Sequence, residues 1–120
     1  MGTRAVYTFR DENNEFHVYK HWDNSPRGAA KFIEKSLKYA WELPRFEADD
    51  FSAAFIRANK PKEGGDIRIT HHFTDHGDLD FRYEIYFTDK MLCVDAYRVL
   101  NEEKIIFSGT LENFKLWSKK

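Results

Sequence analysis

Cysteine is almost absent from this sequence, which has only Cys93 among its 120 residues. An intrachain disulfide is therefore excluded, and a reducing compartment such as the cytoplasm fits the composition best. Because Cys93 lies in the apolar stretch 91–94, we expect a buried, unreactive thiol rather than a nucleophile. The sequence also has no apolar run near the ~20 residues that a membrane-spanning helix needs, so we expect no membrane association.

An excess of charge of one sign is also missing. The chain has 19 basic and 20 acidic residues, and the two signs alternate along nearly every segment. Proteins that bind nucleic acid through its phosphates usually carry a basic excess or a basic stripe. We therefore expect no nucleic-acid partner, and a contact through Arg4, Arg27 and Lys31 is the weaker alternative.

Sequence motifs that mark enzymes are absent as well. Gly64-Gly65 precedes a predicted strand and not a helix, so it does not form a phosphate-binding loop. There is no Gly-x-Ser-x-Gly, Cys-x-x-Cys or His-Glu-x-x-His segment. We assign no catalytic residue and expect no cofactor, which favours a protein that is not an enzyme without deciding the matter.

Aromatic residues, by contrast, are abundant, with eleven Phe, six Tyr and three Trp. The hydrophobic fraction of 42% is enough for a single domain over residues 1–120 with one core. This number of large rings exceeds what a small core needs, so we expect some of them at the surface, where they commonly contact a partner.

The first half of the chain predicts a hairpin followed by helices. Residues 4–10 and 16–20 alternate as strands do, and the polar residues 11–14 between them suit a turn. Residues 23–26 mark a helix start, where Ser25 can cap and Pro26 suits the first turn. Apolar residues then recur at helical spacing as far as Trp41, and a second helix is predicted at about 47–59.

The second half predicts strands, because the apolar period changes there from 3.6 to 2. Residues 67–73, 79–87, 92–99 and 104–108 read as four strands, and Thr110 can cap a last short helix. Since consecutive strands usually pair, we expect a meander. The predicted fold is α+β, with an antiparallel sheet of about six strands in ββ-αα-ββββ-α order and the two central helices on one face.

Histidine and aspartate suggest one kind of site. Side chains of this type hold zinc and similar metals, and a neutral histidine can also serve as a general base near pH 7. A hairpin turn at 75–78 and an ordinary polar strand face at 17–21 explain the same residues without a ligand. The residues of this metal or small-ligand hypothesis are His17, His21, Asp23, His72, Asp75 and His76.

The outer face of the predicted sheet suggests another kind of site. It carries tyrosine and arginine, which commonly anchor protein interfaces, although cross-strand ion pairs on a solvated face would use the same residue types. The residues of this interface hypothesis are Tyr19, Trp22, Arg68, Arg82, Tyr86 and Tyr97.

Several segments resemble a group of small bacterial and prophage-type proteins with no assigned activity. They are RAVYTF at 4–9, FHVYKHWD at 16–23, GAA at 28–30, AWELPRFEAD at 40–49 and HGD at 76–78. The resemblance implies a phage-derived cytoplasmic protein, and small accessory proteins of phages often act by binding other proteins.

Taken together, these observations predict a non-enzymatic protein-interaction module, for which the partner is another protein or a second copy in a homodimer. The alternative is a protein that binds a metal such as zinc, or a small ligand, through the histidines and aspartates named above. A hydrolase that uses such a site is one form of this alternative.

Overall fold

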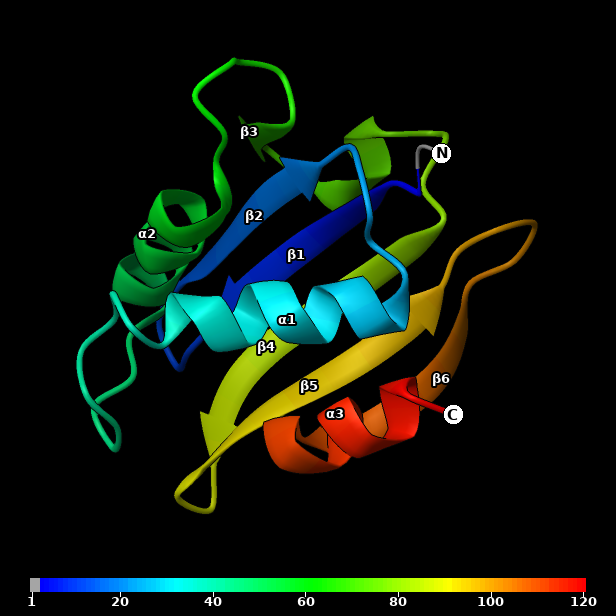
Figure 1. The fold of residues 1–120 in the computed structure, drawn as a ribbon. Coiled ribbons are helices and arrows are strands. Elements are labelled where there is room, and N and C mark those ends of the chain that lie inside the picture. The colour runs from blue at the N-terminus through cyan, green and yellow to red at the C-terminus, as the bar shows by residue number, and fades with distance from the viewer. Residues whose placement is uncertain (1–2) are drawn as a thin grey trace.

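The fold is described from a computed structural model that covers residues 3–120, so the first two positions of the predicted domain 1–120 lie outside the described residues. It consists of a six-stranded sheet and three α-helices, which confirms the predicted α+β class (Figure 1). The elements in chain order are β1 (Ala5–Arg10), β2 (Glu15–Lys20), α1 (Pro26–Ser36), α2 (Ala48–Asn59), β3 (Ile67–Thr70), the 3-10 helix η1 (Phe73–Asp75), β4 (Phe81–Thr88), β5 (Met91–Arg98), β6 (Lys104–Thr110) and α3 (Leu111–Ser118).

The sheet is mixed, so the prediction of a purely antiparallel sheet is wrong. Its spatial order is β3-β2-β1-β4-β5-β6, and β1 and β4 are parallel neighbours while every other pair is antiparallel. The reason is the connection between β3 and β4, residues 71–80, which is long enough to cross two strands instead of turning back. The predicted four-strand meander is therefore reduced to β4-β5-β6.

The same connection also changes the predicted order of elements, because it contains η1 where a hairpin loop was expected. The His72 ring accepts a hydrogen bond from the backbone N–H of Thr74, and the Asp75 carboxylate accepts one from the backbone N–H of His72. These reciprocal bonds fix a helical turn at this point of the chain.

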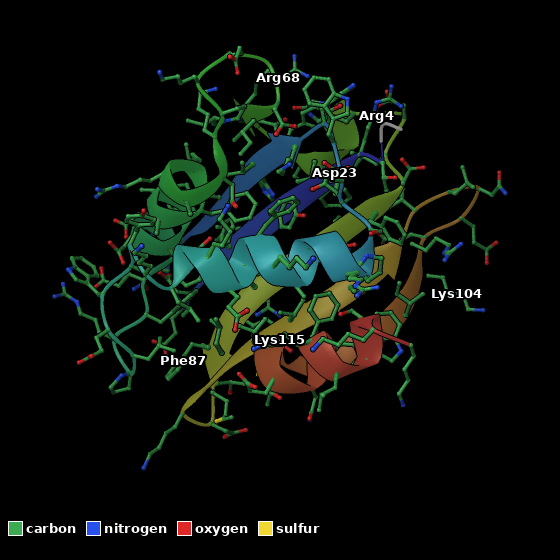
Figure 2. The ribbon with its side chains drawn as sticks, in the orientation of Figure 1. Arg4, Asp23, Arg68, Phe87, Lys104 and Lys115 are labelled. Carbon is green, nitrogen blue, oxygen red and sulfur yellow. The ribbon has the colours of Figure 1, made fainter. Side chains whose placement is uncertain are left out.

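One face of the sheet carries the core and all three α-helices. Tyr7, Phe9 and Tyr83 point to this face, where Phe55 of α2 and Phe114 of α3 pack against them. Figure 1 shows α1 and α3 in front of the strands. From α3, Lys115 reaches the Glu34 carboxylate of α1 and forms an ion pair with it (Figure 2). The predicted placement of the central helices on one face is confirmed.

Helix α1 ends at Ser36, well before the position that its apolar spacing predicts. The apolar positions Ala40 and Trp41 lie beyond it, in a segment whose Trp41 N–H donates to Asp50 of α2 at 2.9 Å. Helix α2 begins at Ala48, where the Asp11 carboxylate of the β1–β2 turn accepts the first free N–H at 2.7 Å. A carboxylate from another element thus caps α2 in place of a local capping residue.

Candidate functional site

The sheet face opposite the three α-helices, here called the open face, carries the polar side chains of the strands. In β1, Thr8 and Arg10 point to it, and in β2 His17 and Tyr19 do so, because they alternate with the core residues. Cross-strand pairing continues the same face over β4, β5 and β6.

Residues 71–79 cross one half of the open face. Leu79 of this segment packs on Val6 and Tyr19 to form a second, smaller apolar cluster, and Phe73 adds to its edge. Val6 and Tyr19 are 0% and 3% exposed as a result. The half of the open face near β2 and β1 is therefore covered by the chain itself, while no helix among residues 3–120 covers the half over β4–β6.

Two histidines come together where residues 71–79 lie against β2. The rings of His17 and His72 lie 5.3 Å apart. On His17, Nδ1 is 2.8 Å from the Thr8 hydroxyl and Nε2 is 3.1 Å from a Glu15 carboxylate oxygen. Burial lowers the pKa of His17. Glu15 acts in the opposite direction and raises this pKa, whereas His72 and Arg82 lower it further. A neutral ring with the proton on Nε2 fits these contacts, because a carboxylate only accepts hydrogen bonds.

Two further histidines of this region, His76 and His21, are also held by side-chain contacts. The His76 ring stacks on Tyr19 at 4.3 Å between ring centroids, and its Nε2 is 2.8 Å from the Thr70 hydroxyl. Nδ1 of His21 is 2.9 Å from the Tyr19 hydroxyl. The two predicted histidine clusters do converge, but they converge as parts of the packing that holds residues 71–79 on the sheet.

A metal site does not emerge from this convergence. Within residues 3–120, no three His, Cys, Asp or Glu side chains are grouped so that they could hold a metal ion. Asp75 is used to cap η1, and Asp23 lies in the loop before α1 (Figure 2). The four histidines and Asp75 of the metal hypothesis form hydrogen bonds within the fold instead.

Arg82 lies at the border between the covered and uncovered halves of the open face. Its guanidinium carbon is 4.3 Å from the Phe73 ring centroid and 4.1 Å from that of Tyr97. Its nitrogens form ion pairs with Glu84 and, at 2.8 Å, with Glu103. Because Arg82 is only 5% exposed, it acts mainly as a support that holds Tyr97 in place.

The uncovered half carries a second arginine, Arg10, which is partly exposed. Its guanidinium carbon lies 4.0 Å from the centroid of the Tyr86 ring, and its Nε is 3.0 Å from Glu84. The Tyr86 hydroxyl donates to Asp95 at 2.7 Å, and the Ser108 hydroxyl donates to the same carboxylate oxygen at 2.7 Å. Side chains from four strands thus fix one another at the surface.

Burial and the hydrogen bond to Asp95 raise the pKa of Tyr86 to about 12. The phenol therefore stays neutral at physiological pH and keeps donating its proton to the carboxylate. The surface around it, here called the open-face patch, also includes the half-exposed apolar side chains Met91 and Ile105. Its residues are Arg10, Tyr86, Met91, Asp95, Tyr97, Ile105 and Ser108.

The six residues of the interface hypothesis fall into different environments. Tyr86 and Tyr97 lie in the open-face patch, whereas Tyr19 and Arg82 are buried. Arg68 is exposed over the Tyr19 ring, and Trp22 is exposed beside His21. Arg10 and Ile105 belong to the patch but were not among the predicted residues. Alternation with Thr8 is the signal that could have assigned Arg10 to the polar face, but the sequence does not show which neighbouring strand brings Tyr86 to it.

Comparisons of the chain with protein-family models, with curated proteins and with solved structures found no match, and so give no support to the resemblance to prophage-type proteins. Among residues 3–120, no helix is long and apolar enough to cross a membrane.

Proposed function

We propose that this protein is a non-enzymatic interaction module that binds another protein through the open-face patch. The observation that carries the proposal is the stacked pair of Arg10 and Tyr86, which is held by Glu84 and Asp95 and lies on a sheet half without a covering helix among residues 3–120.

Preorganisation is the physical reason that this pair suits binding. Tyrosine and arginine are enriched among the residues that carry most of the binding energy at interfaces. Long side chains normally lose rotamer freedom on association, which costs about 0.5–1.5 kcal/mol for each one. Ion pairs and hydrogen bonds already restrict Arg10 and Tyr86 in the free protein, so less freedom remains to be lost.

The composition of the patch favours a protein over a small molecule as the partner. Its residues lie on a sheet face, with apolar Met91 and Ile105 at 45% and 50% exposure around a mixed-charge centre. A mixture of apolar, aromatic and charged groups on one surface is typical of protein interfaces, whereas small ligands prefer enclosed pockets. Asp95 beside Arg10 also disfavours a polyanion such as nucleic acid.

Two matched variants test the proposal. Ile105→Glu places a charge in the open-face patch, and Leu116→Glu places one on α3, on the other face of the sheet. Both side chains are exposed, so neither substitution creates a core cavity. Each purified protein is immobilised and used to capture partners from a bacterial lysate, and thermal unfolding checks that the fold is intact.

The expected result is a stoichiometric protein partner that wild type and Leu116→Glu capture and Ile105→Glu does not. Equal capture by all three proteins would show that the open-face patch is not the binding surface. If sedimentation velocity shows that the wild type alone is a dimer and Ile105→Glu a monomer, the partner is a second copy of the chain and not another protein.

A further inference from the structure

A second surface lies at the edge of the sheet formed by β3, next to α2. There, a groove of about 650 Å³ separates α2 from the ends of β2 and β3. Its apolar walls are Phe16, Ile56 and Ile69, and Ala53 leaves room on the helix side. Ile69 is 82% exposed and Phe16 is 40% exposed, so two large apolar side chains face solvent beside this groove.

The backbone of the edge strand is also open to a partner here. The N–H of His21 donates to the carbonyl of Asp66 at 2.9 Å, so Asp66 directs its backbone groups toward β2. Backbone groups alternate along an antiparallel strand, and therefore Ile67 and Ile69 direct theirs away from β2. The Ile67 carbonyl accepts a hydrogen bond from the Lys60 ammonium at 3.1 Å, in agreement with this orientation. Since β3 is the last strand of the sheet, the outward groups of Ile69 face no further strand.

Two carboxylates give the groove its charge. Glu15 and Asp49 line it from β2 and from α2, and no lysine or arginine does. The nearest cationic candidate for Glu15 is His17, but burial lowers the pKa of that ring and keeps it neutral at pH 7. The groove is therefore apolar with an acidic rim, and it complements a partner that combines apolar and basic side chains.

A second copy of this chain does not fit the same surface. In a twofold dimer the same patch meets itself, so Glu15 and Asp49 of both copies would share one interface with no basic side chain from the groove lining to offset them. Like charges placed opposite each other across an interface disfavour the association. The charge pattern thus argues for a different protein as the occupant.

From these observations we infer that the groove binds an extended peptide segment of another protein, with an apolar side chain between Phe16 and Ala53 and lysine or arginine next to Glu15 and Asp49. The segment adds to the outer edge of β3, where the backbone groups of Ile69 bond to it as they would to a further strand. This site is separate from the open-face patch and does not depend on it.

The test uses two blocked peptides of the same length, one of alternating lysine and isoleucine and one of alternating glutamate and isoleucine. Each is titrated into the ¹⁵N-labelled full chain while amide chemical shifts are recorded. We expect the lysine peptide to shift the amides of Phe16, Ala53 and Ile69 and to bind about tenfold more tightly than the glutamate peptide, because two exposed ion pairs are gained.

Three variants sharpen the experiment. The double variant Glu15→Lys with Asp49→Asn should reverse the preference in favour of the glutamate peptide. Ala53→Lys should fill the groove and abolish binding of both peptides. The matched control Glu102→Lys changes a charge in the β5–β6 turn and should leave the wild-type preference intact.

Equal affinity for the two peptides, or shifts confined to other surfaces, would contradict the inference. So would a wild-type dimer in sedimentation velocity that Ile69→Lys dissociates, because the occupant would then be a second copy. Neither result bears on the open-face patch, whose test relies on Ile105.

Discussion

Asn24 links several segments in the interior of the molecule. Its side-chain oxygen accepts from the Tyr7 hydroxyl at 2.7 Å, and its amide donates to the carbonyls of Thr3, Lys20 and Trp22. The Tyr83 hydroxyl donates to the Asn24 carbonyl at 2.7 Å. The residue is fully buried, so these bonds have no water to replace them.

Asn24→Ala should therefore lower the free energy of unfolding by about 2–3 kcal/mol, because it leaves a buried hydroxyl and several carbonyls without partners. Urea denaturation measures this change. The matched control Asn113→Ala removes an exposed side chain from α3 and should stay within about 0.5 kcal/mol of wild type. Equal stabilities for the two variants would contradict the role assigned to Asn24.

Tyr86 gives a prediction that depends on pH. Its pKa of about 12 lies above the unfolded value near 10, so the neutral phenol is favoured in the folded protein. The corresponding stability is fully present below pH 10 and is lost as the pH rises from about 10 to about 12. Titration of ¹³C-labelled tyrosine by NMR reports the pKa directly.

Asp95→Asn should lower the pKa of Tyr86 part of the way from about 12 toward 10. The substitution removes the negative charge of Asp95, while the burial of the phenol remains. Asp89→Asn removes a carboxylate from the neighbouring turn and should leave this pKa unchanged. A Tyr86 pKa near 10 in the wild type would show that the hydroxyl is not held by Asp95.

At the scale of elements, the start of α1 depends on a close approach that only glycine allows. A Cβ atom at Gly28 would lie 2.0 Å from the carbonyl oxygen of Asp23, whose own φ is 66°. In an ordinary helix interior, replacing glycine by alanine is stabilising by up to about 1 kcal/mol. Here the preceding loop folds over the helix and reverses that expectation.

Gly28→Ala should therefore destabilise the protein by about 1–3 kcal/mol, the usual range for a group forced into a filled space. Gly64→Ala, in a loop where a Cβ meets nothing within 4 Å, serves as the control and should be close to neutral. Thermal unfolding of both variants compares them. A Gly28→Ala protein as stable as wild type would mean that the loop does not pack here as described.

The sequence predicted elements well where a local pattern governs them. The structure shows the predicted alternation in β4. It also shows the predicted cap, because the Thr110 hydroxyl accepts a hydrogen bond from the Asn113 N–H at 3.2 Å. The end of α1 was misplaced because its apolar spacing continues to Trp41, whereas Asp50 of α2 holds that residue outside the helix. The capping of α2 by Asp11 was equally hidden, since the two residues are far apart in sequence.

At the scale of the whole molecule, strand order decides the candidate site. Arg10 meets Tyr86 only because β4 lies parallel to β1, and nothing in either segment encodes that neighbour. The predicted meander would have placed β3 beside β4. In the structure, β3 lies on the far side of β2, and Leu79 of the connecting segment packs on Val6 and Tyr19. His17 is the one histidine among residues 3–120 that this arrangement buries.

The same arrangement separates the two candidate binding regions. The open-face patch lies over β4–β6, and the groove lies at the β3 edge of the sheet beside α2. A partner on one region can therefore be distinguished from a partner on the other by the side chains that it shields.

Hydroxyl-radical footprinting of the protein with its captured partner shows whether the open-face patch is the binding surface, because it reports the solvent exposure of individual side chains. We expect the oxidation of Met91 and Tyr97 to slow several-fold in the complex, while Phe16 and Trp41 react as in the free protein. Protection of Phe16 without protection of Met91 and Tyr97 would contradict the assignment of the open-face patch as the binding surface.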